Sequence, residues 1–339
     1  MIQHNKPTID DKDKTSLSEV LDTGWLAGGA NVAAFEAEFA ELYGLPGEHA
    51  VAVSSGSAAL FLALQAMNVK RKKVAIPVFS CSSLENAVHL SQGEAVYVDT
   101  RKESFNMEQA SLDNADIIVH PHMFGYPSEI NESLRGRVIE DCAQSIGSRV
   151  NGQLVGLQGE LGVFSFYATK LLTSAGQGGM VVSRNTDYIS FIRDYIDFDQ
   201  KNDGKSRFNL SMTDIQAAMG RNQLARLFES FIPRREEIYR SYCDAGVNLY
   251  DTPEVGVEPV RYRALLRVGS PSLVIKYLYK KGIRAIIPIS EAEILGGSPH
   301  SFVNAKLHSS SWVSIPCYPS LNNTEIEEII DALKKMKVT

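Results

Sequence analysis

Short apolar runs alternate with helical patterns from about residue 50 onward. These runs are rich in Val, Ile and Ala, and they stand at 51–53, 74–76, 95–98, 116–119, 137–139, 162–166 and 180–183. After the first two of them, residues 55–67 and 82–90 carry helical patterns. Strands that alternate with helices form a mostly parallel sheet. Because the runs are apolar throughout, we expect strands that helices bury on both faces.

The period of the apolar positions becomes helical after Tyr188. Residues 212–243 predict one or two long helices, with a break or kink at Pro233 because proline disrupts a helix interior. A smaller α/β portion is expected to follow, with a strand at 264–268 and a helix at 271–281.

The last predicted helix spans 324–335, and Asn323 or Thr324 is its expected N-cap. Together these patterns predict an α/β fold of two unequal domains. Residues 1–240 are expected to form a large domain, with an N-terminal segment and a mostly parallel sheet flanked by helices. Residues 241–339 are expected to form a smaller C-terminal α/β domain.

Charge and composition exclude several classes of protein. The net charge of -6 and the lack of a basic cluster argue against a nucleic-acid partner. Neither a secretory signal nor an apolar run long enough for a membrane span is present. The four cysteines show no CxxC pairing, and the histidines are not spaced as ligands, so no metal is predicted. We expect a soluble, cytoplasmic protein.

The first candidate site lies where the run at 51–53 leads directly into a helix. Gly56 lets a ligand approach the backbone, while Ser55 and Ser57 carry hydroxyl groups. The exposed N–H groups of a first helical turn favour a phosphate. A plain helix cap is the alternative interpretation.

A second candidate lies at the carboxyl end of the run at 137–139. Asp141 and Gln144 follow this strand, where open α/β sheets bind ligands. A carboxylate at that place can keep a pyridinium nitrogen protonated, and the amide can bond a ring oxygen. Alternatively, Asp141 is the N-cap of a helix.

A lysine beyond the run at 162–166 is the third candidate. Lys170 stands among aromatic and small residues, where desolvation would lower its pKa and make the neutral amine available for imine formation. Ser165 can offer its hydroxyl to the same phosphate, and the glycines at 176–179 allow a loop to pass close to a ligand. Most lysines, however, are simply solvated.

These segments together resemble a known family. VAVSSGSAALFLAL, VIEDCAQSIGS and FSFYATKLLTSAGQGGMVVS, in this order, are similar to the DegT/StrS-type sugar aminotransferases of the aspartate aminotransferase fold, fold type I. Further segments, among them HMFGYPSE, FNLSMTDIQAAMGRNQLARL and SIPCYPSLNNTEIEEII, extend the resemblance over most of the chain.

The resemblance implies a pyridoxal 5'-phosphate (PLP) cofactor in the large domain. Lys170 falls on the lysine that forms the internal aldimine, Asp141 on the partner of the pyridine nitrogen and Gln144 on a residue that contacts the ring hydroxyl. The phosphate cradle is implied at Gly56, Ser57 and Ser165.

The same resemblance implies partners and a reaction. Asn209 falls on an asparagine that reaches the phosphate bound by a neighbouring subunit, so a homodimer with shared active sites is expected. L-glutamate or L-glutamine would give its amino group to a keto sugar on a nucleoside diphosphate, with ping-pong kinetics. The retained Lys170 disfavours a sugar dehydratase, whose relatives have His there. Biosynthesis of lipopolysaccharide or another surface polysaccharide is the expected context.

The chain also departs from the family pattern. Cys81 stands where many members stack an aromatic ring on the cofactor, so Phe79 is considered as a substitute. Gln177 replaces a usual Glu, and the region 282–303, which helps to select the substrate, is abbreviated. Two alternatives therefore stay open: a PLP enzyme that acts on a cyclitol, another non-sugar ketone or an amino acid, and a non-catalytic PLP-binding regulatory protein.

Overall fold

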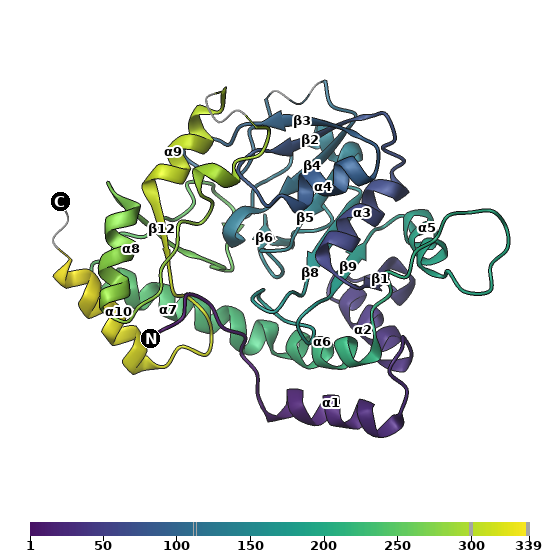
Figure 1. Ribbon diagram of the computed structural model, residues 1–339, viewed down its shortest axis with the longest axis horizontal. Coiled ribbons are helices and arrows are strands. Elements are labelled where there is room, and N and C mark those ends of the chain that lie inside the picture. Colours follow the sequence, from purple (N-terminus) through teal and green to yellow (C-terminus); the bar gives the residue numbers. More distant parts are fainter. Residues whose placement is uncertain (111, 113, 298–300, 337–339) are drawn as a thin grey trace.

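A central sheet organises the computed structural model, which describes residues 1–110, 112, 114–297 and 301–336 (Figure 1). Its seven strands have the order β1-β9-β8-β5-β4-β2-β3. They are β1 (Ala50–Val53), β2 (Lys73–Pro77), β3 (Glu94–Val98), β4 (Ile117–Pro121), β5 (Val138–Asp141), β8 (Leu161–Ser165) and β9 (Gly179–Val182). The pairs among β3, β2, β4, β5 and β8 are parallel, whereas β9 runs antiparallel to β1 and β8. The prediction of a mostly parallel sheet is confirmed.

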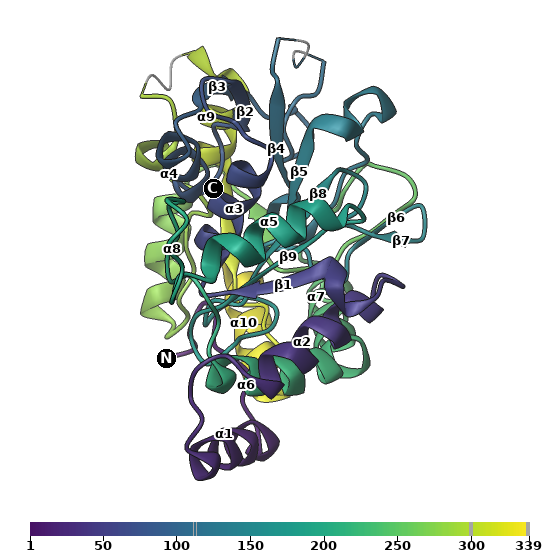
Figure 2. The same cartoon turned by 90° about the vertical axis from the view of Figure 1, so that its right-hand side faces the viewer.

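Helices cover both faces of this sheet. α3 (Gly56–Ala66), α4 (Ser83–Leu90) and α5 (Thr186–Ile196) contribute to one buried cluster, and α2 (Ala30–Glu41) and α6 (Asp214–Arg226) contribute to another. α1 (Asp11–Thr23) packs against α6, beyond the second layer (Figure 2).

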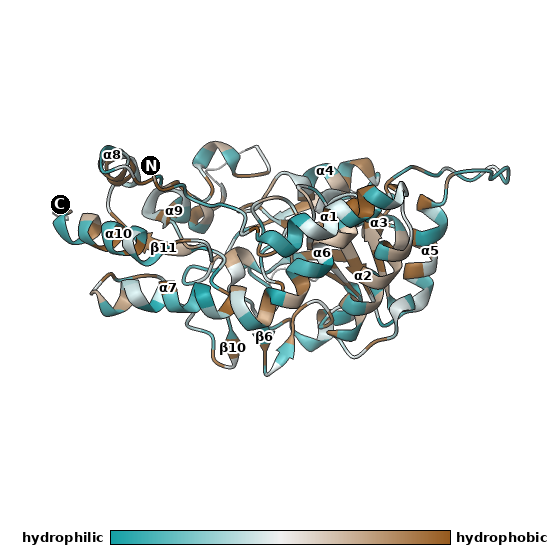
Figure 3. Ribbon diagram, turned by 90° about the horizontal axis from the view of Figure 1, so that it is seen from below, coloured by the Kyte–Doolittle hydropathy of each residue, from teal (hydrophilic) through white to brown (hydrophobic). Residues whose placement is uncertain are grey.

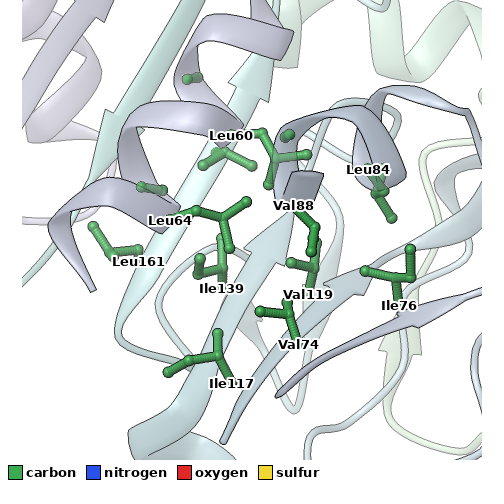
Figure 4. Close-up of a cluster of buried hydrophobic side chains, with 14 of the residues drawn as sticks. Leu60, Leu64, Val74, Ile76, Leu84, Val88, Ile117, Val119, Ile139 and Leu161 are labelled. Atoms are coloured by element: carbon green, nitrogen blue, oxygen red, sulfur yellow. The ribbon is translucent and has the colours of Figure 1, made fainter. Parts of the chain in front are cut away.

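The two clusters use opposite faces of each strand. In β1, Val51 and Val53 join the α3 side, while Ala50 and Ala52 join the α2 side. Figure 4 shows the first cluster, in which leucines of α3 meet branched side chains of the strands. Strands buried on both faces explain why the sequence runs are apolar throughout.

The long helical pattern after residue 212 is interrupted once. α6 passes into a π-helical turn at Leu227–Phe231, and α7 (Ile232–Asp244) follows. Pro233 lies in the first turn of α7, where a missing N–H breaks no helical bond. The predicted break is therefore present, and it lies just before the proline.

The C-terminal part is a smaller α/β unit. Strands β11 (Ala264–Arg267) and β12 (Trp312–Ile315) pair antiparallel. Its helices are α8 (Pro271–Lys280), α9 (Val303–Ser311) and α10 (Asn323–Lys335). Asn322 caps α10 by accepting from the Glu325 N–H, so the expected caps Asn323 and Thr324 were wrong by one or two positions.

Short elements complete the chain. The pair Ile2 and Ile283 forms a parallel bridge, so the N-terminal segment packs on the C-terminal unit. The predicted division after residue 240 falls inside α7 and stays a prediction. In the described residues, no helix is long and apolar enough to cross a membrane. The remaining short elements are β6 (Arg149–Val150), β7 (Gln153–Leu154), β10 (Val257–Glu258), η1 (Gly47–His49), η2 (Met123–Gly125), η3 (Glu132–Arg137) and η5 (Glu291–Glu293).

Candidate active site

A cavity of about 260 Å³ lies at the carboxyl ends of the central strands, beside the start of α3. This is the edge at which open α/β sheets bind ligands. Of the eight residues that the family resemblance places at the cofactor, seven line it and Asn209 does not. The seven are Gly56, Ser57, Cys81, Asp141, Gln144, Ser165 and Lys170.

The start of α3 and the end of β8 form a tight cradle. A Cβ atom on Gly56 would lie 2.5 Å from the Ser165 Cβ, so a side chain cannot fit there without moving the backbone. Ser55 is the N-cap of α3, since its hydroxyl accepts from the Ala58 N–H at 3.1 Å. The cap interpretation is thus correct for Ser55, while Ser57 and Ser165 face the cavity. Two hydroxyl groups and a helix N-terminus suit a phosphate.

Asp141 presents a carboxylate to the cavity from the last position of β5. Its Oδ1 accepts from the Ala143 N–H at 2.9 Å. Burial raises the pKa of the carboxyl, although this hydrogen bond and the charge of Lys170 oppose the change. A turn and then β6 follow, so the alternative of a helix N-cap was wrong. The carboxylate suits a protonated ring nitrogen as its partner.

Gln144 is oriented by the backbone of a neighbouring loop. Its Oε1 accepts from the Phe124 N–H at 2.9 Å. The amide nitrogen Nε2 is therefore the end that can donate to a ligand oxygen. This agrees with the expected contact to a ring hydroxyl.

Lys170 projects from a loop that its own backbone ties down. The Phe166 N–H donates to the Gly178 carbonyl at 2.8 Å, and the Lys170 N–H donates to the Tyr167 carbonyl at 2.9 Å. The side chain is half-buried, and its Nζ lies 5.5 Å from the centre of the Tyr262 ring. A restrained amine beside Asp141 is well placed for imine chemistry.

Three residues that were expected near the cofactor lie in different surroundings. Phe79 is fully buried against the rings of Phe105 and Phe124 and does not line the cavity, so it is not a substitute for the missing aromatic ring. Cys81 is exposed and lines the cavity. Asn209 is exposed outside it, next to Leu210, whose carbonyl accepts from the Ser54 N–H at 2.7 Å.

A second cavity, of about 730 Å³, continues from the first. The two share Ser80, Cys81, Gln144 and Lys170, and the second reaches the loop at 288–297. Residues 298–300 of the abbreviated region lie outside the described residues. We call the joined space the cleft. It is large enough for a sugar and part of a nucleotide.

The sequence analysis missed the wall of the cleft that the C-terminal unit supplies. Tyr262 and Arg263 line it, just before β11. The one signal in the sequence was a cluster of arginines next to an apolar strand, which is also common on protein surfaces.

A buried polar group adjoins the cavity, which His122 also lines. His122, Glu140 and Cys142 have ligand atoms within 4.8 Å of one another. Glu140 already accepts from His122 Nε2 at 3.0 Å and from the N–H groups of Gly156 and Gly159, each at 2.8 Å. Burial raises the pKa of the Cys142 thiol, which keeps it protonated. We interpret the group as structural.

Comparisons with known proteins agree on the family and the fold. The DegT/DnrJ/EryC1/StrS aminotransferase family matches residues 7–334. A GDP-perosamine synthase from Vibrio cholerae is 33% identical over 71% of this chain and 70% of its own. A UDP-N-acetyl-3-dehydro-alpha-D-glucosamine 3-aminotransferase from Acidithiobacillus ferrooxidans is 27% identical over 96% of this chain and 94% of its own.

Solved structures give the same result. The aminotransferase TlmJ from Streptoalloteichus hindustanus has a TM-score of 0.89 and 25% identity, over 98% of both chains. A protein from Streptococcus pneumoniae, solved in a PLP form, has a TM-score of 0.88 and 21% identity, over 98% of this chain and 97% of its own. The likeness to these structures confirms the predicted fold type.

Proposed function

Because the chain belongs to the DegT/DnrJ/EryC1/StrS aminotransferase family and is a PLP-dependent aminotransferase, we propose that it aminates a keto sugar carried on a nucleoside diphosphate. The amino donor is L-glutamate or L-glutamine. The observation that carries the proposal is the convergence of Lys170, Asp141 and Gln144 on a cavity that opens into a larger cleft. The names of the relatives quoted above support a nucleotide-linked sugar as the acceptor.

Each residue of the cavity has a distinct part in this proposal. Bound PLP supplies an electron sink for the carbon that loses a proton. Lys170 Nζ would hold the cofactor, and its amine is placed to move a proton at the donor's α-carbon. Asp141 would keep a proton on the ring nitrogen, and Gln144 Nε2 would donate to the ring oxygen. Ser57 and Ser165 donate their hydroxyl protons to the phosphate.

The assignment of Lys170 can be tested directly. Borohydride reduction of the PLP-loaded protein, followed by mass spectrometry, is expected to find the cofactor mass on Lys170. Lys170→Ala is expected to lose this label and at least about 10²- to 10⁴-fold in turnover, the usual contribution of a proton-transfer group. Lys280→Ala, which changes an exposed lysine of α8, is the matched control. Persistent turnover in Lys170→Ala would contradict the assignment.

Donor and acceptor need separate measurements. L-glutamate or L-glutamine is expected to shift the absorbance of the bound cofactor from the pyridoxal to the pyridoxamine form. A panel of keto sugars, cyclitols and simple ketones then identifies the acceptor. A protein that binds PLP but takes no amine from any donor would contradict catalysis and favour a regulatory role.

We also propose that the active unit is a homodimer in which Asn209 reaches the partner's phosphate. Asn209 is exposed and outside its own cavity, on the segment between α5 and α6, part of which projects from the body (Figure 3). Phe208, the neighbour of Asn209 in the chain, is 64% exposed, and Trp25 is 61% exposed; a second copy would cover such apolar side chains. The segment after α1 contacts the start of α6, since the Asp214 N–H donates to the Leu26 carbonyl at 3.3 Å.

Subunit mixing tests this arrangement. Lys170→Ala and Asn209→Asp are each expected to be impaired alone. If Asn209 acts across the interface, a mixed dimer contains one intact site, and mixing restores activity. Mixing that restores nothing would place Asn209 in its own subunit's site or outside any site.

We also propose that the protein works in the cytoplasm and that its product enters a surface polysaccharide. The four cysteines are free, which suits the reducing cytoplasm. A relative named as a spore coat polysaccharide biosynthesis protein, from Bacillus subtilis, supports a surface polysaccharide as the destination of the amino sugar.

A further inference from the structure

Three cations surround one aromatic ring in the wall of the cleft. The Tyr262 ring centre lies 5.5 Å from Lys170 Nζ, 5.3 Å from the Arg263 Cζ and 5.8 Å from the Arg235 Cζ. Within the described residues, none of the three cations forms an ion pair. Burial raises the pKa of Tyr262, but the charges of these cations outweigh it and lower the pKa overall. Positive charge therefore gathers around this ring without a direct ion-pair partner among the described residues.

Arg235 has a structural explanation. It is fully buried, and its Nη1 donates to the Tyr262 carbonyl at 3.2 Å and to the carbonyl of Cys317. These bonds fix the segment from which Arg263 projects. Arg235 does not line the cleft, so it cannot be the residue that meets a ligand.

Arg263 is different, because it lines the cleft and has only neutral partners. Its Nη1 faces His4 Nε2 at 3.3 Å and the Ser314 Oγ at 3.5 Å. Burial, together with Arg263 and Arg284, lowers the pKa of His4 to about 3, so the imidazole is neutral at physiological pH. Among the described atoms, Arg263 Nε is buried with no hydrogen-bond partner.

The two glutamates that line the second cavity form their hydrogen bonds with other groups, although the charge of Glu293 acts on Arg263. Glu293 accepts from the N–H and the hydroxyl of Ser290, at 2.8 and 2.6 Å. Glu85 accepts from the Tyr97 hydroxyl. A half-buried guanidinium without a carboxylate is costly unless a ligand supplies the anion.

We propose that Arg263 binds the α-carboxylate of the amino donor. This inference rests on the proposed function and adds the residue that recognises the donor. A guanidinium presents a planar fork of donors that matches a carboxylate.

The position of Arg263 favours a carboxylate over the sugar nucleotide's diphosphate. Lys170 Nζ and Arg263 both lie next to the Tyr262 ring and both line the second cavity, so the reacting amine and the anion site share one part of the cleft. In an amino acid, the carboxylate is attached to the very carbon that carries the amine. In a nucleotide sugar, the hexose ring lies between the reacting carbon and the diphosphate.

Direct binding is the first test. L-α-methylglutamate has no α-hydrogen, so it can bind the PLP-loaded protein without completing transfer, and calorimetry gives its Kd. Arg263→Met is expected to raise this Kd about 10- to 100-fold, as for the loss of a charge-assisted hydrogen bond. Arg263→Lys should retain part of the affinity. Arg267→Met is the matched control, since Arg267 ends the strand that Arg263 precedes, lies over Trp312 and does not line the cleft.

A donor pair makes the test specific for the α-carboxylate. Wild type should use L-glutamate better than γ-aminobutyrate, which has the same amine and side-chain carboxylate but lacks the α-carboxylate. In Arg263→Met this preference should fall by the same factor as the affinity. The reaction of the pyridoxamine-loaded variant with the keto sugar should fall much less than its reaction with L-glutamate, and circular dichroism checks separately that the variant is folded.

Three results would overturn the inference. Unchanged L-α-methylglutamate binding with a raised KM for the keto sugar would assign Arg263 to the diphosphate. An Arg263→Met variant equal to wild type in both measurements would remove the anion site altogether. A wild-type protein that takes no amine from glutamate or glutamine would contradict the proposed donor itself, and that failure is visible without any Arg263 variant.

Discussion

The two sides of strand β5 end in adjacent carboxylates with opposite surroundings. Asp141 faces the cofactor cavity, where one backbone N–H contacts it and burial raises its pKa. Glu140 is fully buried on the other side. There, burial would raise its pKa, but His122 and the N–H groups of Gly156 and Gly159 lower it overall.

The comparison shows that burial alone does not decide the charge of a carboxylate. Both groups lose solvent, but only Glu140 receives a full set of protein donors in return. Asp141 is left with capacity for a further donor, and the cavity is where that donor would come from. A ligand with a protonated ring nitrogen would give Asp141 the further donor that the protein itself supplies to Glu140.

The largest expected effect is on catalysis. Asp141→Asn should reduce the rate of the donor reaction about 10²- to 10⁴-fold, because an amide cannot keep the ring nitrogen protonated. Single-turnover absorbance measurements with L-glutamate give this rate. Glu140→Gln, measured below its unfolding temperature, is the control and should retain most of the rate. Equal losses in the two variants would remove the functional distinction between the carboxylates.

The next effect is on stability. Glu140→Gln should lower the free energy of unfolding by about 1–3 kcal/mol, because the buried donors around this side chain lose a charged acceptor. Urea unfolding of the apoprotein measures it. A double-mutant cycle with His122→Asn should give a coupling of about 0.5–3 kcal/mol, because the two side chains are in contact. Strict additivity would show that the backbone donors alone hold Glu140.

The stabilisation by Glu140 should depend on pH in the acid range. The folded pKa of Glu140 is below its ordinary 4.5, so its stabilisation is complete above that value and is lost as the pH falls through the folded pKa. The destabilisation by Glu140→Gln should therefore shrink below pH 4.5, by at most about 1.4 kcal/mol per pH unit for one proton. Chemical unfolding across this range tests it. A difference that does not depend on pH would mean that Glu140 is not charged in the folded protein.

The sequence predicted the sheet and the cofactor side of the cleft for a physical reason. Strands buried on both faces leave continuous apolar runs, and the catalytic side chains follow those strands directly, as Asp141 follows 137–139. The cap of α10 was misplaced because Asn322, Asn323 and Thr324 all suit that position.

The other wall of the cleft could not be predicted in the same way. Arg263 meets Lys170 only through Tyr262, a contact between segments far apart in the chain. Phe79 follows a strand like the true site residues, yet it turns into an aromatic cluster instead of the cavity. Local patterns give the end of a strand, but the direction of each side chain there depends on tertiary packing.

The smallest expected effect is on the stability of the apoprotein, and its sign is opposite to that expected for Glu140→Gln. The folded pKa of Asp141 lies above its ordinary 3.8, so the ionised group destabilises the apoprotein at neutral pH, and this cost disappears as the pH falls through the folded pKa. Asp141→Asn should accordingly raise the free energy of unfolding of the apoprotein at pH 7 by about 0.5–2 kcal/mol, as often follows when a strained functional group is removed. The same urea experiment, run with and without PLP, measures it. With PLP bound the gain should vanish or reverse, because Asp141 then has its partner; a variant less stable than wild type without PLP would mean that the Ala143 hydrogen bond already offsets the burial of Asp141.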